Sequence, residues 1–79
     1  MVRSPVVAGQ FYESDPDLLR DQIKSCFLHE LGPGLPAGKA HDVRATISPH
    51  AGYAFSGPCA CHCYRLVAES PVPEFYLLI

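Results

Sequence analysis

Residues 43–53 have the sequence VRATISPHAGY, and the fold predicted for the chain depends mainly on them. The first six are mostly apolar or β-branched and stop at Pro49, as a buried strand of an α/β sheet does. The turn that follows contains His50, and Gly52 permits a positive φ angle or a close approach of a ligand to the backbone. Ligands of open α/β sheets bind beyond the carboxyl ends of the strands. This turn is therefore the predicted position of a functional site.

Two helices and a second strand are predicted around this stretch. The sequence DPD at 15–17 combines an acidic N-cap with a proline in the first turn, and it predicts a helix that ends before the loop 32–38, which is rich in glycine and proline. A second helix is expected over 56–68, with its cap at the first or second residue and Pro58 in its first turn. Residues 74–79, EFYLLI, read as a second buried strand. Strand, helix and strand in this order predict a βαβ unit with parallel strands.

Composition narrows the class of protein. The 79 residues are 48% hydrophobic, which indicates a packed interior, although a chain this short supports one core at most. Six basic residues against eight acidic ones give a net charge of −2, and this argues against a nucleic-acid partner. The sequence contains neither an apolar run of about 18 residues nor the apolar core of a signal peptide. A cytoplasmic protein without a membrane partner is expected.

Three of the four cysteines, Cys59, Cys61 and Cys63, crowd into the second predicted helix. Without a secretory signal they are expected to be reduced. Cys59 and Cys63 share a helix face with His62, so a soft-metal patch for Zn or Cu(I) is one reading. The other reading, which we prefer, is that these thiols pack as small hydrophobic side chains.

His50 is the one residue whose position favours chemistry. Its imidazole either binds a metal or moves a proton at the sheet edge, or it is a turn histidine held by a local hydrogen bond, and position alone leaves both readings open. No Gly-x-Ser-x-Gly elbow, phosphate loop or zinc-ribbon cysteine pair is present in the sequence.

Several motifs together resemble the opening of the Memo family in order and spacing: VAGQFY at 7–12, ISPHAGY at 47–53 and SGP at 56–58. The resemblance spans nearly the whole chain. It implies that residues 1–79 are an incomplete N-terminal part of a single Memo-like domain. That domain is a larger three-layer α/β domain similar to the class III extradiol dioxygenases, and this chain would supply its βαβ-containing N-terminal portion.

The resemblance also implies a site. His50 matches the first of the family's pocket histidines, while Phe11, Tyr53 and Phe55 fall where aromatic residues line the pocket; no catalytic residue is assigned. The complete protein is then expected to bind a redox-active metal, non-haem iron or copper, with oxidoreductase activity. The alternatives are a non-catalytic module that binds a peptide or small ligand, and an inactive truncated product.

By itself the chain is expected to be inactive, to bind no metal and to fold poorly. One imidazole does not hold such a metal, and two strands with unpaired edges are marginally stable. Its expected partner is the missing C-terminal remainder of the domain.

Overall fold

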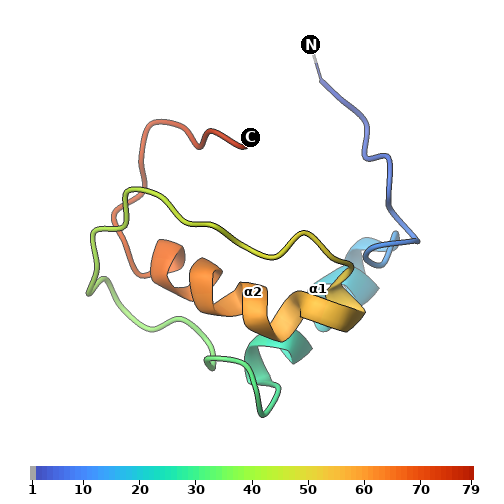
Figure 1. Ribbon diagram of the computed structural model, residues 1–79, viewed down its shortest axis with the longest axis horizontal. Helices are drawn as coiled ribbons and strands as arrows, with labels where there is room; N and C mark the ends of the chain where they lie inside the picture. Colours follow the sequence, from blue (N-terminus) through green and yellow to red (C-terminus); the bar gives the residue numbers. More distant parts are fainter. Residues whose placement is uncertain (1) are drawn as a thin grey trace.

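The structure, a computed structural model, describes residues 2–79 and contains two helices joined and flanked by irregular chain (Figure 1). Helix α1 spans Pro16–Leu28 and helix α2 spans Tyr53–Ala68. The two helices pack against each other. No helix among residues 2–79 has the length and apolar character needed to cross a membrane.

Helix α1 begins where the sequence predicts. Asp15 has an extended conformation, and its carboxylate accepts a hydrogen bond from the Leu18 backbone N–H at 3.0 Å. Pro16 occupies the first turn, where its missing N–H costs nothing, and Asp17 places a second negative charge near the positive end of the helix dipole. The helix is followed by a turn in which Gly34, at φ +85°, donates its N–H to the Phe27 carbonyl.

Helix α2 begins earlier than predicted. It starts at Tyr53 rather than near residue 56, so Pro58 lies inside the helix and not in its first turn. The reason is a tertiary contact: the Tyr53 N–H donates to the Phe11 carbonyl at 2.7 Å, and the Tyr53 ring packs on Tyr12 with 5.4 Å between ring centroids. This contact satisfies one of the N–H groups that a helix start leaves without a partner.

The helices approach each other closely at Gly57 of α2 and Cys26 of α1, both of which are buried. A Cβ atom added at Gly57 would lie 3.3 Å from the Cys26 Cβ and would collide with its sulfur. Cys61, one turn beyond Gly57, is also buried. The absence of a side chain at Gly57 is therefore what lets this part of the core close.

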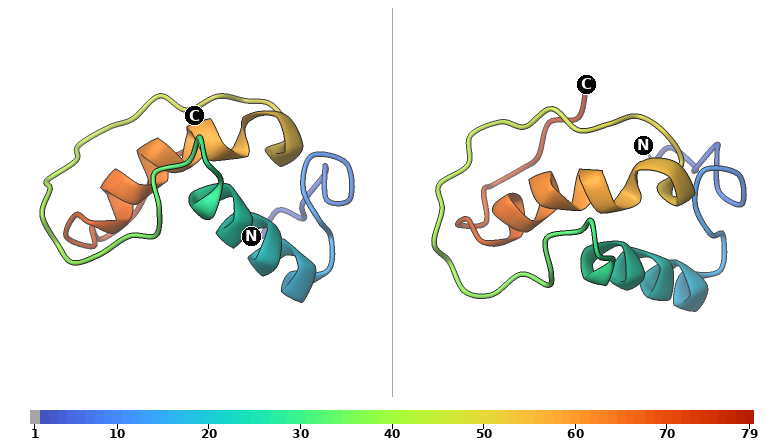
Figure 2. Two further views of the ribbon diagram at one scale, coloured as in Figure 1. Left: turned by 90° about the horizontal axis from the view of Figure 1, so that it is seen from below. Right: turned by 60° about the horizontal axis from the view of Figure 1, so that its bottom comes forward.

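The two predicted strands are not formed. Residues 43–48 and 74–79 have no regular secondary structure, and in Figures 1 and 2 both run back from the C-terminal end of α2 towards its N-terminal end. Within the part of the chain that the structure describes, no backbone-to-backbone hydrogen bond involves residues 42–51 or 71–79. The predicted βαβ unit is thus not observed, and neither is a three-layer arrangement in residues 2–79. A β-strand is stabilised by hydrogen bonds to a neighbouring strand, and an isolated pair of strands is at best marginally stable.

Candidate functional site

His50 lies in the irregular turn that leads into α2, and its side chain is exposed. Among the described residues His50 makes no hydrogen bond. The local hydrogen bond expected of a histidine that only stabilises a turn is therefore not present. The hydroxyl of Ser48, two residues earlier, is buried and finds no partner among residues 2–79. Near this turn the chain therefore carries two polar side chains, Ser48 and His50, that have no hydrogen-bond partner among residues 2–79.

The N-terminal arm supports this turn. Residues 7–12 form a tight loop in which Gly9, at φ +84°, donates its N–H to the Tyr12 carbonyl at 2.7 Å. The Phe11 carbonyl then accepts from Tyr53, and a Cβ added at Gly52 would lie 3.2 Å from that same oxygen. Gly52 therefore matters because the arm passes so near, and the arm limits how the backbone beside His50 can move.

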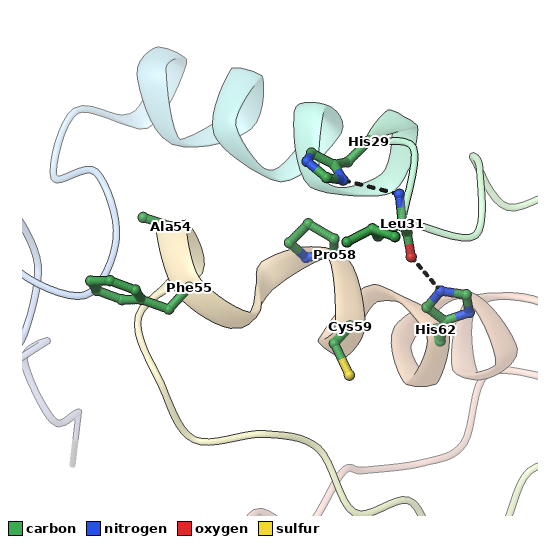
Figure 3. Close-up of a pocket in the computed structure, with 7 residues that line it drawn as sticks. All are labelled: His29, Leu31, Ala54, Phe55, Pro58, Cys59 and His62. Atoms are coloured by element: carbon green, nitrogen blue, oxygen red, sulfur yellow. Dashed lines mark hydrogen bonds between the residues drawn. The ribbon is translucent and has the colours of Figure 1, made fainter.

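The structure brings together two of the three predicted pocket residues. Phe11 and Tyr53 meet at the hydrogen bond that joins arm and helix. Phe55 is 89% exposed and lines a different hollow, shown in Figure 3. Tyr53 and Phe55 both lie in the first turn of α2, and their side chains point to different sides because residues two apart on a helix do not share a face.

The hollow of Figure 3 has a volume of about 260 Å³ and lies between α2 and the chain that leaves α1. Both histidines in it are engaged by Leu31: His29 Nδ1 accepts from the Leu31 N–H at 3.0 Å, and His62 Nε2 lies 2.8 Å from the Leu31 carbonyl. Because these two ring nitrogens contact backbone groups of Leu31, the rest of the lining of the hollow is mainly apolar, apart from the exposed thiol of Cys59.

No soft-metal patch is assembled on α2. Cys63 Sγ donates to the Ile47 carbonyl at 3.5 Å, and His62 is held by Leu31. Across residues 2–79 there is no group of three or more His, Cys, Asp or Glu side chains arranged to hold a metal ion. The four cysteines are free thiols.

A larger apolar groove of about 470 Å³ runs between α1 and α2. Tyr53, Tyr64 and Tyr76 contribute to its walls, together with Cys26 and Cys61. Burial raises the pKa of the Cys26 thiol, and it raises the pKa of Cys61 to about 11, with a further contribution from the nearby Cys26. Burial also raises the pKa of Tyr53. These groups are neutral at physiological pH, so the groove has no reactive thiolate.

A polar cluster around Glu69, at the C-terminal end of α2, was not predicted. The Glu69 carboxylate accepts from the Ala37 N–H at 2.9 Å and from Arg65 Nε at 3.1 Å, and lies 3.4 Å from His41 Nε2. The Ala37 hydrogen bond, and then Arg65, lower the pKa of Glu69 despite its burial. Lys39 Nζ donates to the carbonyls of Ala68 and Ser70, which places a cation at the negative end of α2.

This cluster anchors the loop between the helices. The Glu69 carbonyl accepts from the N–H groups of Ala40 and His41, and the Ser70 hydroxyl accepts from Val43. In the sequence, Glu69 looks like any other acidic residue, and only its burial in the structure sets it apart. That burial requires the loop between the helices to fold back onto the end of α2, and no local sequence pattern predicts this contact.

Comparison with known proteins assigns the chain to a class of α/β protein. The sequence model of the Memo-like protein family matches residues 3–79. The chain is 52% identical over 84 residues to a MEMO1 family protein of Methanopyrus kandleri and 49% identical over 81 residues to one of Methanothermobacter thermautotrophicus. A MEMO1 family protein of Nitrosopumilus maritimus is 43% identical over 79 residues.

The chain belongs to the Memo-like family, and the resemblance seen in the sequence is confirmed. Each of these relatives is matched over 100% of this chain but over only 28 to 29% of its own length. Membership implies a larger α/β fold than residues 2–79 display. No solved structure matches the chain.

Proposed function

We propose that this chain supplies one imidazole ligand, His50, to a redox-active metal site in a Memo-type α/β domain, where iron or copper would support an oxidoreductase activity. The observation that carries the proposal is that the imidazole of His50 is exposed and has no hydrogen-bond partner among the described residues. His50 lies in the turn that the N-terminal arm holds in place, within residues 3–79 that the family model matches. Neutral imidazole is the side chain that such metals commonly use.

Residues 2–79 do not fit a complete site, because an oxygenase-type centre needs three protein ligands with open positions and only one suitable imidazole stands at this turn. The remaining ligands would come from the polypeptide that a domain of the relatives' length adds. In this chain, the part played by Phe11 and Tyr53 is positional, because the hydrogen bond from the Tyr53 N–H to the Phe11 carbonyl holds the turn.

The test uses a chimera in which residues 1–79 replace the matching part of the Methanopyrus kandleri relative. Metal content after purification and iron or copper titration are compared for the parent, His50→Ala and His41→Ala. The second variant is a matched control, since His41 is also an exposed imidazole but contacts Glu69. His50→Ala alone should lose stoichiometric metal. Equal metal content in all three proteins would contradict the proposal.

A second candidate is a module that binds a peptide or small ligand without turnover. It is favoured by the groove of about 470 Å³ between the helices, whose walls are mainly apolar and aromatic. In that case the chimera would be metal-free and would bind a fluorescent apolar probe. Binding of the probe would be unchanged by His50→Ala and weakened by Tyr64→Ala, because Tyr64 lines the groove.

A further inference from the structure

The buried side chains between the two helices are thiols. Among residues 2–79, the buried apolar side chains are those of Cys26 on α1 and Cys61 on α2, which are 8% and 5% exposed. Neither belongs to the proposed metal site, and neither is bonded to another cysteine. A core built on thiols can be altered by oxidation, which aliphatic side chains in the same places would not undergo.

Both thiols lie against one face of α2. The Cys26 thiol donates to the Tyr53 carbonyl at 3.9 Å, and its sulfur occupies the space that a side chain at Gly57 would fill. Residues 53, 57 and 61 follow one another at a spacing of four, so they share a face of the helix. The Cα–Cβ bond of a helical residue is tilted towards the N-terminal end of its helix. The side chain of Cys61 is therefore directed towards Gly57, where the Cys26 sulfur lies.

Two further observations support this pairing. Both thiols line the groove between the helices, and Cys26 contributes to the raised pKa of Cys61, as a group close to it would. The other thiols of α2 face elsewhere: Cys59 is exposed in the hollow of Figure 3, and Cys63 donates to the Ile47 carbonyl. Cys61 is therefore the thiol of α2 that faces Cys26.

We infer that Cys26 and Cys61 form a reversible disulfide that locks α1 to α2 when the protein meets a hydroperoxide. One thiol, as its thiolate, attacks a peroxide oxygen and becomes a sulfenic acid, and water leaves. The second thiol attacks the sulfur of that sulfenic acid, the S–S bond forms, and a second water leaves. Two electrons pass from the two thiols to hydrogen peroxide, and a dithiol reductant returns them. This redox device goes beyond the proposed metal site and needs no metal.

The contact between the helices permits the bond. A disulfide needs Cβ atoms within about 4.5 Å of each other, and the absence of a side chain at Gly57 leaves the space between the two thiols open. A small sliding of one packed helix along the other, a common motion in proteins, completes the approach. Because burial keeps both thiols neutral and the thiolate is the nucleophile, the device responds slowly and to sustained oxidation.

The experiment treats the full chain, and in parallel the chimera, with hydrogen peroxide at pH 8 and maps the bonds by proteolysis and mass spectrometry without reduction. We expect the main bond in both proteins to join Cys26 to Cys61, to raise the melting temperature of the helices and to be reversed by dithiothreitol. Cys61→Ala should leave Cys26 as a sulfenic acid that dimedone labels. Cys59→Ala is the matched control, because it removes an exposed thiol of the same helix and should leave the bond unchanged.

A main bond between Cys59 and Cys63, bonds only between separate molecules, or no bond between Cys26 and Cys61 in either protein would each overturn the inference. Loss of the bond in Cys59→Ala would do the same. Formation of the bond at the same rate in the urea-unfolded chain would also overturn it, because the fold would then not direct the pairing.

Discussion

An engineered disulfide between the helices tests the core packing directly. Gly57→Cys places a second thiol opposite Cys26, with 3.3 Å between the two Cβ positions. Disulfides span Cβ separations of about 3.5 to 4.5 Å, so a shift of a few tenths of an ångström is enough for the bond to form. The native thiols of α2 are poorer partners for the new residue. Cys61, at i+4 from it, lies about 5 to 6 Å away between Cβ atoms.

The magnitude follows from two opposing effects. In the reduced variant the new side chain overfills the contact at Cys26, which should lower the free energy of unfolding by about 1 to 3 kcal/mol. In the oxidised variant the bond closes a loop of roughly 30 residues, which should raise the free energy of unfolding by up to about 3.6 kcal/mol relative to the reduced form. Oxidation should therefore turn a destabilised protein into one with a more persistent helix pair.

The assay equilibrates the variant in a glutathione buffer, maps the bonds by proteolysis and mass spectrometry without reduction, and follows helix melting by circular dichroism. Ser56→Cys is the control, because the Ser56 hydroxyl bonds the Ala51 and Gly52 carbonyls of its own turn and does not face α1. Pairing of Cys26 with the control thiol as readily as with the one introduced at residue 57, or a melting temperature that oxidation does not raise, would refute the packing described for the helix interface.

Three further predictions concern the cap, the polar cluster and the thiols. Asp15→Ala should destabilise α1 by about 1 kcal/mol, measured by urea titration of the helix signal, because it removes the acceptor for an N-terminal N–H. Glu69 has a folded-state pKa below its ordinary value of 4.5, so the stability it contributes is present above that value and is lost as the pH falls through the folded pKa. The Ala37 amide resonance should then shift as its hydrogen bond is lost. At pH 8, iodoacetamide should modify the exposed Cys59 first and Cys61 last, because Cys61 is buried and has a pKa of about 11.

Each of these has a matched control. Asp15→Asn should keep most of the helix stability, since asparagine is also an effective N-cap. Glu69→Gln should abolish the acid-dependent shift of Ala37, and a shift that persists would assign the transition to another group. Modification of Cys61 as fast as Cys59 in the folded chain would show that the helix interface does not exclude the reagent.

Several features follow from the sequence alone, because their causes are local. The start of α1 depends on Asp15 and Pro16, which act within one turn of helix, and the structure has it where they indicate. The three clustered cysteines fall on α2 as expected. Family membership is likewise readable from motifs that are contiguous in the chain, such as ISPHAGY at 47–53.

Other features required the tertiary structure, because their causes lie far away in the sequence. Helix α2 starts at Tyr53 since a carbonyl 42 residues earlier, that of Phe11, accepts its N–H. Glu69 is buried since a loop more than 25 residues upstream folds onto it. Segments 43–48 and 74–79 have the composition of strands and yet remain unpaired, because a strand needs hydrogen-bonding neighbours that local sequence does not provide.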